Sequence, residues 1–516
     1  MAQHQSLPGV APLSPSRHVA PALLVALFAA IAATGIARHR MWLDELNPWV
    51  IARDAHSLPQ LFANMRYERH PALWYLCLYV LTRFTTNPAA MQALHAAIAT
   101  MSVALIAFAA PFRLRDRWLL AFSYYFAYEY CLISRGYALG ILLLLAVCVL
   151  WARLERRLIP IALLLACAAN TSAFGLLLAS ALAAGIMAAD VVHTVSRRVR
   201  MAAATIFLCG AALGVWSLVP APDNMFGREL HTTVEAARAL WTLGLVSIAW
   251  IPLPDLAAPA PWNSSLFLGL WPQAPRNHPL AAIGGAIAVA LALWRVRRHR
   301  PALVATATGT AALLSFTYVG YSGGYRHHGH FFVLVPIALW MAEVESAWWL
   351  SPVLALQVLA GGFFLAAEYR CPFSYSWDLA AFVGRLPKST PVVVAQKDFI
   401  NYAGPPLSGY LRRRVYYATA AFVERGSYLK YDPVRRHGAI ENRLLAQLTR
   451  FGCERRTALY VITNNWECAR LGTRLATFWR HLVPDEHTSS VYRFEPPCEP
   501  DARPNDPRST PAAPPG

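Results

Sequence analysis

The chain has 516 residues, of which 56% are hydrophobic and only 14% charged. Its mean hydropathy is +0.36, and apolar runs near the length of a membrane span recur along it, which excludes a soluble protein and indicates an integral membrane protein. The formal net charge of +18 would suit a nucleic-acid partner. However, many of the arginines fall in short clusters between apolar segments, so the charge indicates membrane topology and no nucleic-acid partner.

The apolar segments predict a mainly α-helical, polytopic bundle of about 11 spans. These segments are 21–37, 88–111, 118–133, 137–152, 158–170, 173–190, 202–219, 279–295, 301–319, 331–345 and 346–366. Residues 1–20 are polar and are predicted to form a cytoplasmic tail, with no cleavable signal peptide. Residues 220–278 lack a clean period and are predicted to form a loop with short helices; a re-entrant segment or an extra pair of spans within 238–254 stays open.

Four arginine clusters fall on one side of the membrane in this assignment. They lie within residues 113–117, 153–157, 197–200 and 295–300. By the positive-inside rule that side is the cytoplasm. The outer side then carries the first loop, residues 220–278, the loop 320–330 and the C-terminal region. Arg38 and Arg40 also fall on the outer side, against the rule.

The first outer loop, residues 38–87, contains two adjacent carboxylates, Asp44 and Glu45. Two carboxylates at a membrane surface can divide one chemical task, with one acting as general base and the other orienting it or holding a cation. The alternative is that the pair only flanks a span at the water interface. The apolar run 71–84 is too short for an ordinary span and is predicted to lie in the interface as a juxtamembrane helix.

The loop 320–330 combines glycines with four basic side chains. These are Arg326, His327, His328 and His330. The imidazoles can ligate a divalent metal and Arg326 can bind a phosphate in a forked geometry, whereas the alternative is an interfacial polar cap. Arg135, at another predicted outer boundary, is either a snorkelling side chain or an anion ligand.

From about residue 367 the composition changes, and residues 367–495 are predicted to form a small α/β domain on the outer side. Its predicted strands lie at 391–395, 414–417, 458–463 and 490–494, and its predicted helices at 398–411 and 439–452. One or two disulfides are expected in an oxidising compartment, among Cys371, Cys453, Cys468 and Cys498. Residues 496–516 contain eight prolines and are predicted to be a disordered tail.

The order of these features resembles the GT-C superfamily of integral membrane glycosyltransferases, particularly bacterial relatives of protein O-mannosyltransferases and of lipid A aminoarabinose transferase. The resemblance covers the layout of roughly residues 20–366, and only the first loop is specific in its motif. It implies that Asp44 is catalytic and that the donor is a sugar on a polyprenyl phosphate. It also associates His70, the basic residue before a proline, with the donor phosphate, and the nearby Glu68 with metal binding.

The sequence therefore predicts a glycosyltransferase of the bacterial inner membrane that moves a sugar from a polyprenyl-phosphate donor to an outer lipid, glycan or protein. The predicted catalytic residues are Asp44 and Glu45. The residues predicted at the donor phosphate are Arg69, His70, Arg135 and Arg326. A divalent cation, where one is used, is expected at Glu68 and His328. A transporter or flippase for a lipid-linked or anionic substrate is the alternative, because charges within broken spans suit it too.

Overall fold

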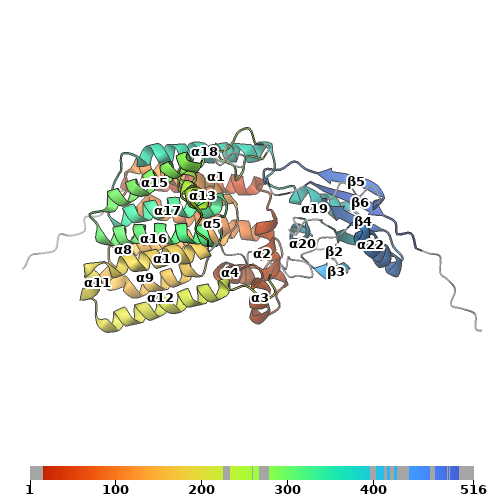
Figure 1. Ribbon diagram of the computed structural model, residues 1–516, viewed down its shortest axis with the longest axis horizontal. Coiled ribbons are helices and arrows are strands. Elements are labelled where there is room, and N and C mark those ends of the chain that lie inside the picture. The colour runs from red at the N-terminus through yellow and green to blue at the C-terminus, as the bar shows by residue number, and fades with distance from the viewer. Residues whose placement is uncertain are drawn as a thin grey trace, which may run out of the picture.

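The computed structural model describes residues 16–224, 233–258, 260–266, 278–395, 403–411, 415–418, 423–426, 441–464, 471–484, 486 and 488–498. A helical bundle and a small sheet lie at opposite ends of the protein, with three short helices between them (Figure 1). Most of the predicted N-terminal tail, nearly all of the predicted proline-rich tail, and Cys468 lie outside the described residues.

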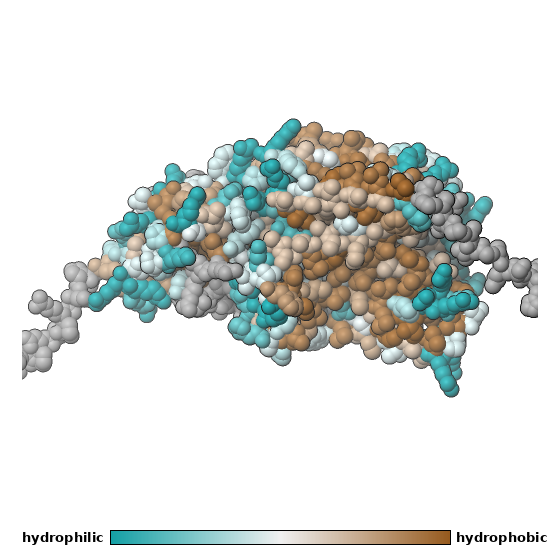
Figure 2. Space-filling model, turned by 180° about the vertical axis from the view of Figure 1, so that it is seen from behind, coloured by the Kyte–Doolittle hydropathy of each residue, from teal (hydrophilic) through white to brown (hydrophobic). Residues whose placement is uncertain are grey.

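The bundle contains helices that match the predicted spans. Among the described residues, six are long and apolar enough to cross a membrane: α1 (Ser16–Arg38), α5 (Ala89–Ala109), α12 (Arg197–Leu218), α15 (His278–Val296), α16 (Arg300–Val319) and α18 (Leu350–Arg370). Shorter helices pack with them: α8 (Gly136–Trp151), α9 (Leu154–Ala169), α10 (Ala173–Met187), α11 (Asp190–Thr194) and α17 (Tyr325–Met341). Hydrophobic side chains gather over the bundle, and hydrophilic ones over the sheet (Figure 2). This distribution is that of a membrane protein.

The predicted span 118–133 is not one continuous helix. It is divided into α6 (Leu114–Ala121), the π-helical turn η1 (Tyr125–Glu129) and α7 (Tyr130–Leu132). The apolar pattern does not reveal this break, because η1 keeps the apolar and aromatic side chains that the pattern counts. Single π-helical turns are frequent at functional sites, and this one carries a buried carboxylate, Glu129.

A further helix, α13 (Ala236–Trp250), packs along α15 in the region predicted as a loop with short helices. With 15 residues it is shorter than the ~20 needed to cross hydrocarbon. The Gln357 amide of α18 donates to the last two carbonyls of α13, those of Ala249 and Trp250, at 2.9 and 3.1 Å. Carbonyls at a helix C-terminus otherwise lack partners within the helix. The chain then leaves the helical conformation and places the Trp262 ring 5.4 Å from that of Trp42.

The C-terminal sheet has six strands in the order β3-β2-β1-β4-β6-β5. They are β1 (Val392–Val394), β2 (Val415–Ala418), β3 (Val423–Gly426), β4 (Leu459–Thr463), β5 (Thr473–Phe478) and β6 (Ser489–Phe494). β1 pairs in parallel with β2 and β4, and the remaining pairs are antiparallel. Helices α19 (Ser376–Arg385) and α20 (Gly404–Tyr410) pack against one face, and α22 (Glu441–Arg455) against the other. A disulfide joins Cys453 to Cys498.

Three short helices connect the bundle to the sheet: α2 (Leu43–Asp54), α3 (Leu58–Met65) and α4 (Leu73–Leu81) (Figure 1). The sequence predicts the helix at α4, within residues 71–84. α2 packs on α20, where the Arg53 guanidinium donates to the Ser408 carbonyl at 2.7 Å. Nearby, the Arg40 guanidinium lies 5.1 Å from the centre of the Trp377 ring in α19. Arg40, which the charge rule does not explain, therefore packs against the sheet region.

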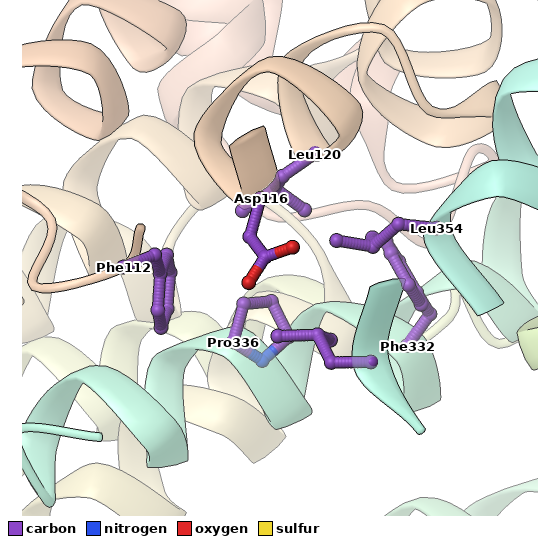
Figure 3. A pocket seen from close by; sticks show the side chains of 7 residues that line it. Phe112, Asp116, Leu120, Phe332, Pro336 and Leu354 are labelled. Atoms are coloured by element: carbon purple, nitrogen blue, oxygen red, sulfur yellow. The ribbon is translucent and has the colours of Figure 1, made fainter. Parts of the chain in front are cut away.

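A small cavity of about 10 Å³, room for roughly one water molecule, lies between α6, α17 and α18. The carboxylate of Asp116 points into it (Figure 3). Its Oδ1 atom accepts a hydrogen bond from Ser351 at 2.6 Å, whereas Oδ2 is buried and has no partner among the described residues. Asp116 thus joins α6 to the first turn of α18.

We expect Asp116→Ala to lower the free energy of unfolding by about 1–3 kcal/mol, because Ser351 loses a buried acceptor and the cavity grows. Arg115→Ala is the matched control: its side chain is 65% exposed, so its ion pair with Asp116 and its hydrogen bond to Ser351 at 2.6 Å contribute little. Thermal unfolding in detergent measures both. Equal melting temperatures for Asp116→Ala and the wild type would contradict this role of Asp116.

Candidate functional site

The two predicted carboxylates lie in the first turn of α2, which begins after Trp42. Glu45 is the third helical residue, and its carboxylate accepts a hydrogen bond from the Trp42 backbone N–H at 3.2 Å. Negative charge is favourable at a helix N-terminus, and a carboxylate at the third position caps it. The capping accounts for Glu45 but leaves the side chain of Asp44 available for another role.

Asp44 lies between two arginines that come from distant parts of the chain. Its Oδ2 atom accepts a hydrogen bond from the Arg326 guanidinium at 2.5 Å, and its backbone carbonyl accepts one from Arg135. The Asp44 side chain is 26% exposed and that of Arg326 13%, so the carboxylate is the more accessible group. Guanidinium groups are suited to bind an anionic ligand, and two of them lie at Asp44.

Arg326 lies in the first turn of α17, although the sequence places it in a loop. Helix α17 begins at Tyr325, earlier than the predicted span at 331, because Gly324 caps it with help from His327, whose ring accepts a hydrogen bond from the Gly324 N–H at 2.9 Å. The Arg326 guanidinium is 5.3 Å from the ring centre of Trp42 and 5.9 Å from that of Trp262. Its buried Nε has no hydrogen-bond partner among the described residues.

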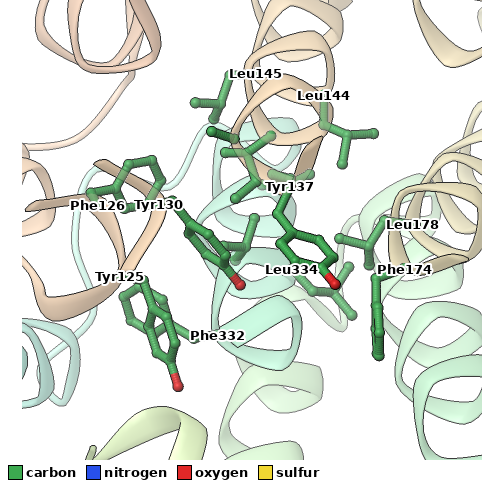
Figure 4. Close-up of a cluster of buried hydrophobic side chains, with 14 of the residues drawn as sticks. Tyr125, Phe126, Tyr130, Tyr137, Leu144, Leu145, Phe174, Leu178, Phe332 and Leu334 are labelled. Carbon is green, nitrogen blue, oxygen red and sulfur yellow. The ribbon is translucent and has the colours of Figure 1, made fainter. Parts of the chain in front are cut away.

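A cluster of buried aromatic rings fixes this turn of α17 (Figure 4). The Tyr130 hydroxyl donates to the Arg326 carbonyl at 2.7 Å, and the Tyr137 hydroxyl is 2.9 Å from His327 Nε2. The ring of Tyr125 stacks on Tyr130 with 5.6 Å between their centres. Rings with few rotatable bonds hold their partners at little cost in conformational entropy, so the position of Arg326 is set by packing.

His70 lies behind Arg135 and accepts a hydrogen bond from it. The distance from Arg135 Nη2 to His70 Nε2 is 2.8 Å, and because a guanidinium can only donate, Nε2 carries no proton. The other ring nitrogen, Nδ1, therefore donates to the carbonyl of Glu68 at 2.6 Å. Burial lowers the pKa of His70 to about 4, which agrees with a neutral ring. His70 therefore orients Arg135 in this state.

Arg69 lies between His70 and Glu68 with a backbone φ of 55°, a left-handed conformation that L-residues with side chains seldom adopt. Strained backbone of this kind concentrates at functional sites. The turn allows both of its neighbours to join the same network. Nothing in its geometry singles out the Arg69 side chain as a ligand, so its role at the donor phosphate remains a prediction.

Glu68 is a second carboxylate of this site. Its two oxygens accept hydrogen bonds from Asn47 at 2.6 Å and from the Tyr75 hydroxyl at 3.1 Å. Burial raises the pKa of Glu68 to about 7, while the nearby Arg135 opposes that rise. Glu68 thus changes its protonation state near neutral pH, a property expected of a group that exchanges protons.

The geometry does not group the residues expected to hold a metal. Within the described part of the chain, no three His, Cys, Asp or Glu side chains converge in a way that could bind a metal ion. His328 donates from Nε2 to the Ser322 carbonyl at 2.7 Å, and Glu68 is satisfied by neutral donors. Zinc sites in proteins have three or four protein ligands, so a site made of Glu68 and His328 alone would bind such a metal more weakly. The predicted cation at Glu68 and His328 therefore remains a prediction, and no metal enters the proposal below.

Glu45 is separated from Asp44 by its surroundings. It is fully buried, and its oxygens accept from the Ser134 backbone N–H at 2.7 Å and from His39 at 3.0 Å. Sequence reasoning missed His39, which lies between two arginines and gives no signal in its spacing. The structure thus brings Asp44, Glu68, His70, Arg135 and Arg326 into one network and gives Glu45 a separate set of partners.

The fold and site define a helical membrane protein in which two arginines, Arg135 and Arg326, bind the partly exposed Asp44 beside the carboxyl group of Glu68. A scan against protein-family models finds no match for this chain, and searches of curated proteins and of solved structures find none either.

Proposed function

We propose that this protein is a glycosyltransferase that moves a sugar from a polyprenyl-phosphate donor to an acceptor on the outer side of the membrane. One observation carries the proposal: the partly exposed carboxylate of Asp44 accepts a hydrogen bond from the Arg326 guanidinium, while the Arg135 guanidinium donates to the Asp44 backbone carbonyl. This arrangement combines a base for an acceptor with cations for a phosphate.

The chemistry requires both parts. The acceptor hydroxyl attacks the anomeric carbon of the donor sugar while the bond from that carbon to the phosphate oxygen breaks. Asp44 accepts the proton of the hydroxyl, and the polyprenyl phosphate leaves with added negative charge, which Arg135 and Arg326 stabilise. The buried Nε of Arg326 supplies a donor that no described residue uses. Because Arg326 donates to Asp44, donor phosphate competes with Asp44 for it.

The membrane topology in this proposal has eleven spans, with the site and the C-terminal sheet on the outer side. Continuous helices at ten of the predicted positions and the broken helix within 118–133 support the count, and α13 fits as a re-entrant helix that does not alter the sidedness. The Cys453–Cys498 disulfide supports the orientation, since disulfides persist in oxidising compartments. The four arginine clusters then face the cytoplasm, as the positive-inside rule requires of an inner-membrane protein.

A reporter fused after Arg370, at the end of α18, should be located on the outer side. The matched fusion after Arg298, between α15 and α16, should be cytoplasmic, because Arg298 belongs to one of the four arginine clusters. An alkaline phosphatase reporter, which is active only outside the cytoplasm, measures both. A cytoplasmic location for the Arg370 fusion would contradict the topology and would place the site on the wrong side for this reaction.

The function itself is tested with purified protein in detergent, a polyprenyl-phosphate sugar and a membrane extract as the source of acceptor. We expect release of polyprenyl phosphate together with transfer of the labelled sugar. If the protein instead moves the labelled lipid across proteoliposomes without releasing polyprenyl phosphate, the transporter alternative replaces the proposal. The charged network within the bundle is the feature that such a transporter would share.

A further inference from the structure

We propose that His39 is a positioning residue that holds the base-bearing turn of α2 against the bundle. The proposal rests on the glycosyltransferase function proposed above. It concerns a second buried network, formed by His39, Glu45, Glu368 and Tyr128, which lies next to the Asp44 cluster and shares none of its side-chain contacts.

The His39 ring lies between two buried carboxylates. Its Nε2 is 3.0 Å from Glu45, and its Nδ1 is 3.0 and 3.2 Å from the two oxygens of Glu368. A carboxylate only accepts hydrogen bonds, so both ring nitrogens donate and the ring is an imidazolium. The side chains of His39 and Glu45 have no exposed surface, and that of Glu368 has 3%.

The charge on the ring is needed because the two carboxylates are out of contact with water. Without it, two negative charges would share one buried space, a strongly unfavourable arrangement. Burial disfavours the imidazolium, but Glu45 and Glu368 outweigh it and raise the pKa of His39 to about 10. The Tyr128 hydroxyl donates a further hydrogen bond to the Glu368 carboxylate at 2.8 Å. The network is thus complete and carries one net negative charge.

The network connects the parts of the protein that surround Asp44. Glu45 accepts from the backbone N–H groups of Trp42 and Ser134, at 3.2 and 2.7 Å. Trp42 precedes the turn that carries Asp44, and Ser134 precedes Arg135, which binds the Asp44 carbonyl. Glu368 belongs to α18, so His39 joins this turn to a helix 329 residues further along the chain. Loss of the imidazolium should therefore loosen the turn that holds the base without removing any group that touches substrate.

The test uses His39→Gln, whose amide can donate to one carboxylate but carries no charge. Turnover should fall about tenfold with little change in the KM for the donor, a smaller loss than the roughly 100-fold that a 1 Å misplacement can cost. Hydrogen–deuterium exchange should be at least about tenfold faster at the backbone N–H groups of residues 42 and 134, which donate to Glu45. The double variant His39→Gln/Glu368→Gln restores the net charge and should recover part of both losses.

Asp116→Asn is the control, because it changes a buried carboxylate that ties α18 to α6 instead of α2. This variant should not change hydrogen exchange at residues 42 and 134. It should also leave kcat/KM unchanged. Unchanged exchange in His39→Gln would overturn the proposal, and so would faster exchange without loss of turnover. If the wild-type protein transfers no sugar, the proposed function fails, while the exchange measurement still decides whether His39 holds the turn.

Discussion

Asp44→Asn should lower turnover by ~10²–10⁴-fold, the loss typical of removing a general acid–base group. The substitution keeps the size and hydrogen-bonding reach of the side chain but removes its charge and its capacity to accept a proton. Arg326 can still donate to the amide oxygen, so expression should stay near that of the wild type. Donor binding should not weaken, because the variant lacks the negative charge that competes with the phosphate for Arg326. Steady-state kinetics of polyprenyl phosphate release measure the effect, and an unchanged KM would locate the loss in the chemical step.

Two variants in the same helix separate the base from its surroundings. Asp54→Asn is the matched control, since Asp54 lies at the other end of α2 with a 32% exposed side chain paired to Arg53, and it should change turnover little. Glu45→Gln weakens the buried contact with His39, so its turnover should fall less than that of Asp44→Asn. Substantial turnover in Asp44→Asn/Glu45→Gln would remove the base from α2 and make Glu68 the next candidate.

The helical layout could be read from the sequence because long apolar runs have few alternatives in a membrane. Broken elements could not be predicted in this way. The π-helical turn at 125–129 and the early start of α17 depend on contacts with other helices, which periodicity does not record. Strand β5 was also missed, since its side chains are mostly exposed and it is placed by pairing with β6 alone.

The site residues were predicted individually, whereas their convergence could not be. Arg135 lies 91 residues after Asp44 in the chain, and Arg326 lies 282 residues after it. Only tertiary packing brings the three side chains together. His39 illustrates the limit, since a histidine beside two arginines at the end of a span is indistinguishable from an interfacial residue. Its function depends on Glu368, and one sequence does not reveal that partner. The available signal was Glu368 itself, a carboxylate near the end of an apolar helix, because such groups need partners.

Arg326→Ala should weaken binding of the donor by about 1.5–3 kcal/mol, the range for hydrogen bonds to a charged group. Arg326→Lys is the matched variant: it keeps the charge but loses the planar fork and the contacts with the rings of Trp42 and Trp262, so it should recover only part of the affinity. Titration of purified protein with the polyprenyl-phosphate sugar measures both. Because Arg326 also pairs with Asp44, the alanine variant leaves that carboxylate to repel the phosphate, which adds to the loss. Unchanged affinity in Arg326→Ala would make Arg326 a structural partner of Asp44 and leave Arg135 as the cation that receives the phosphate.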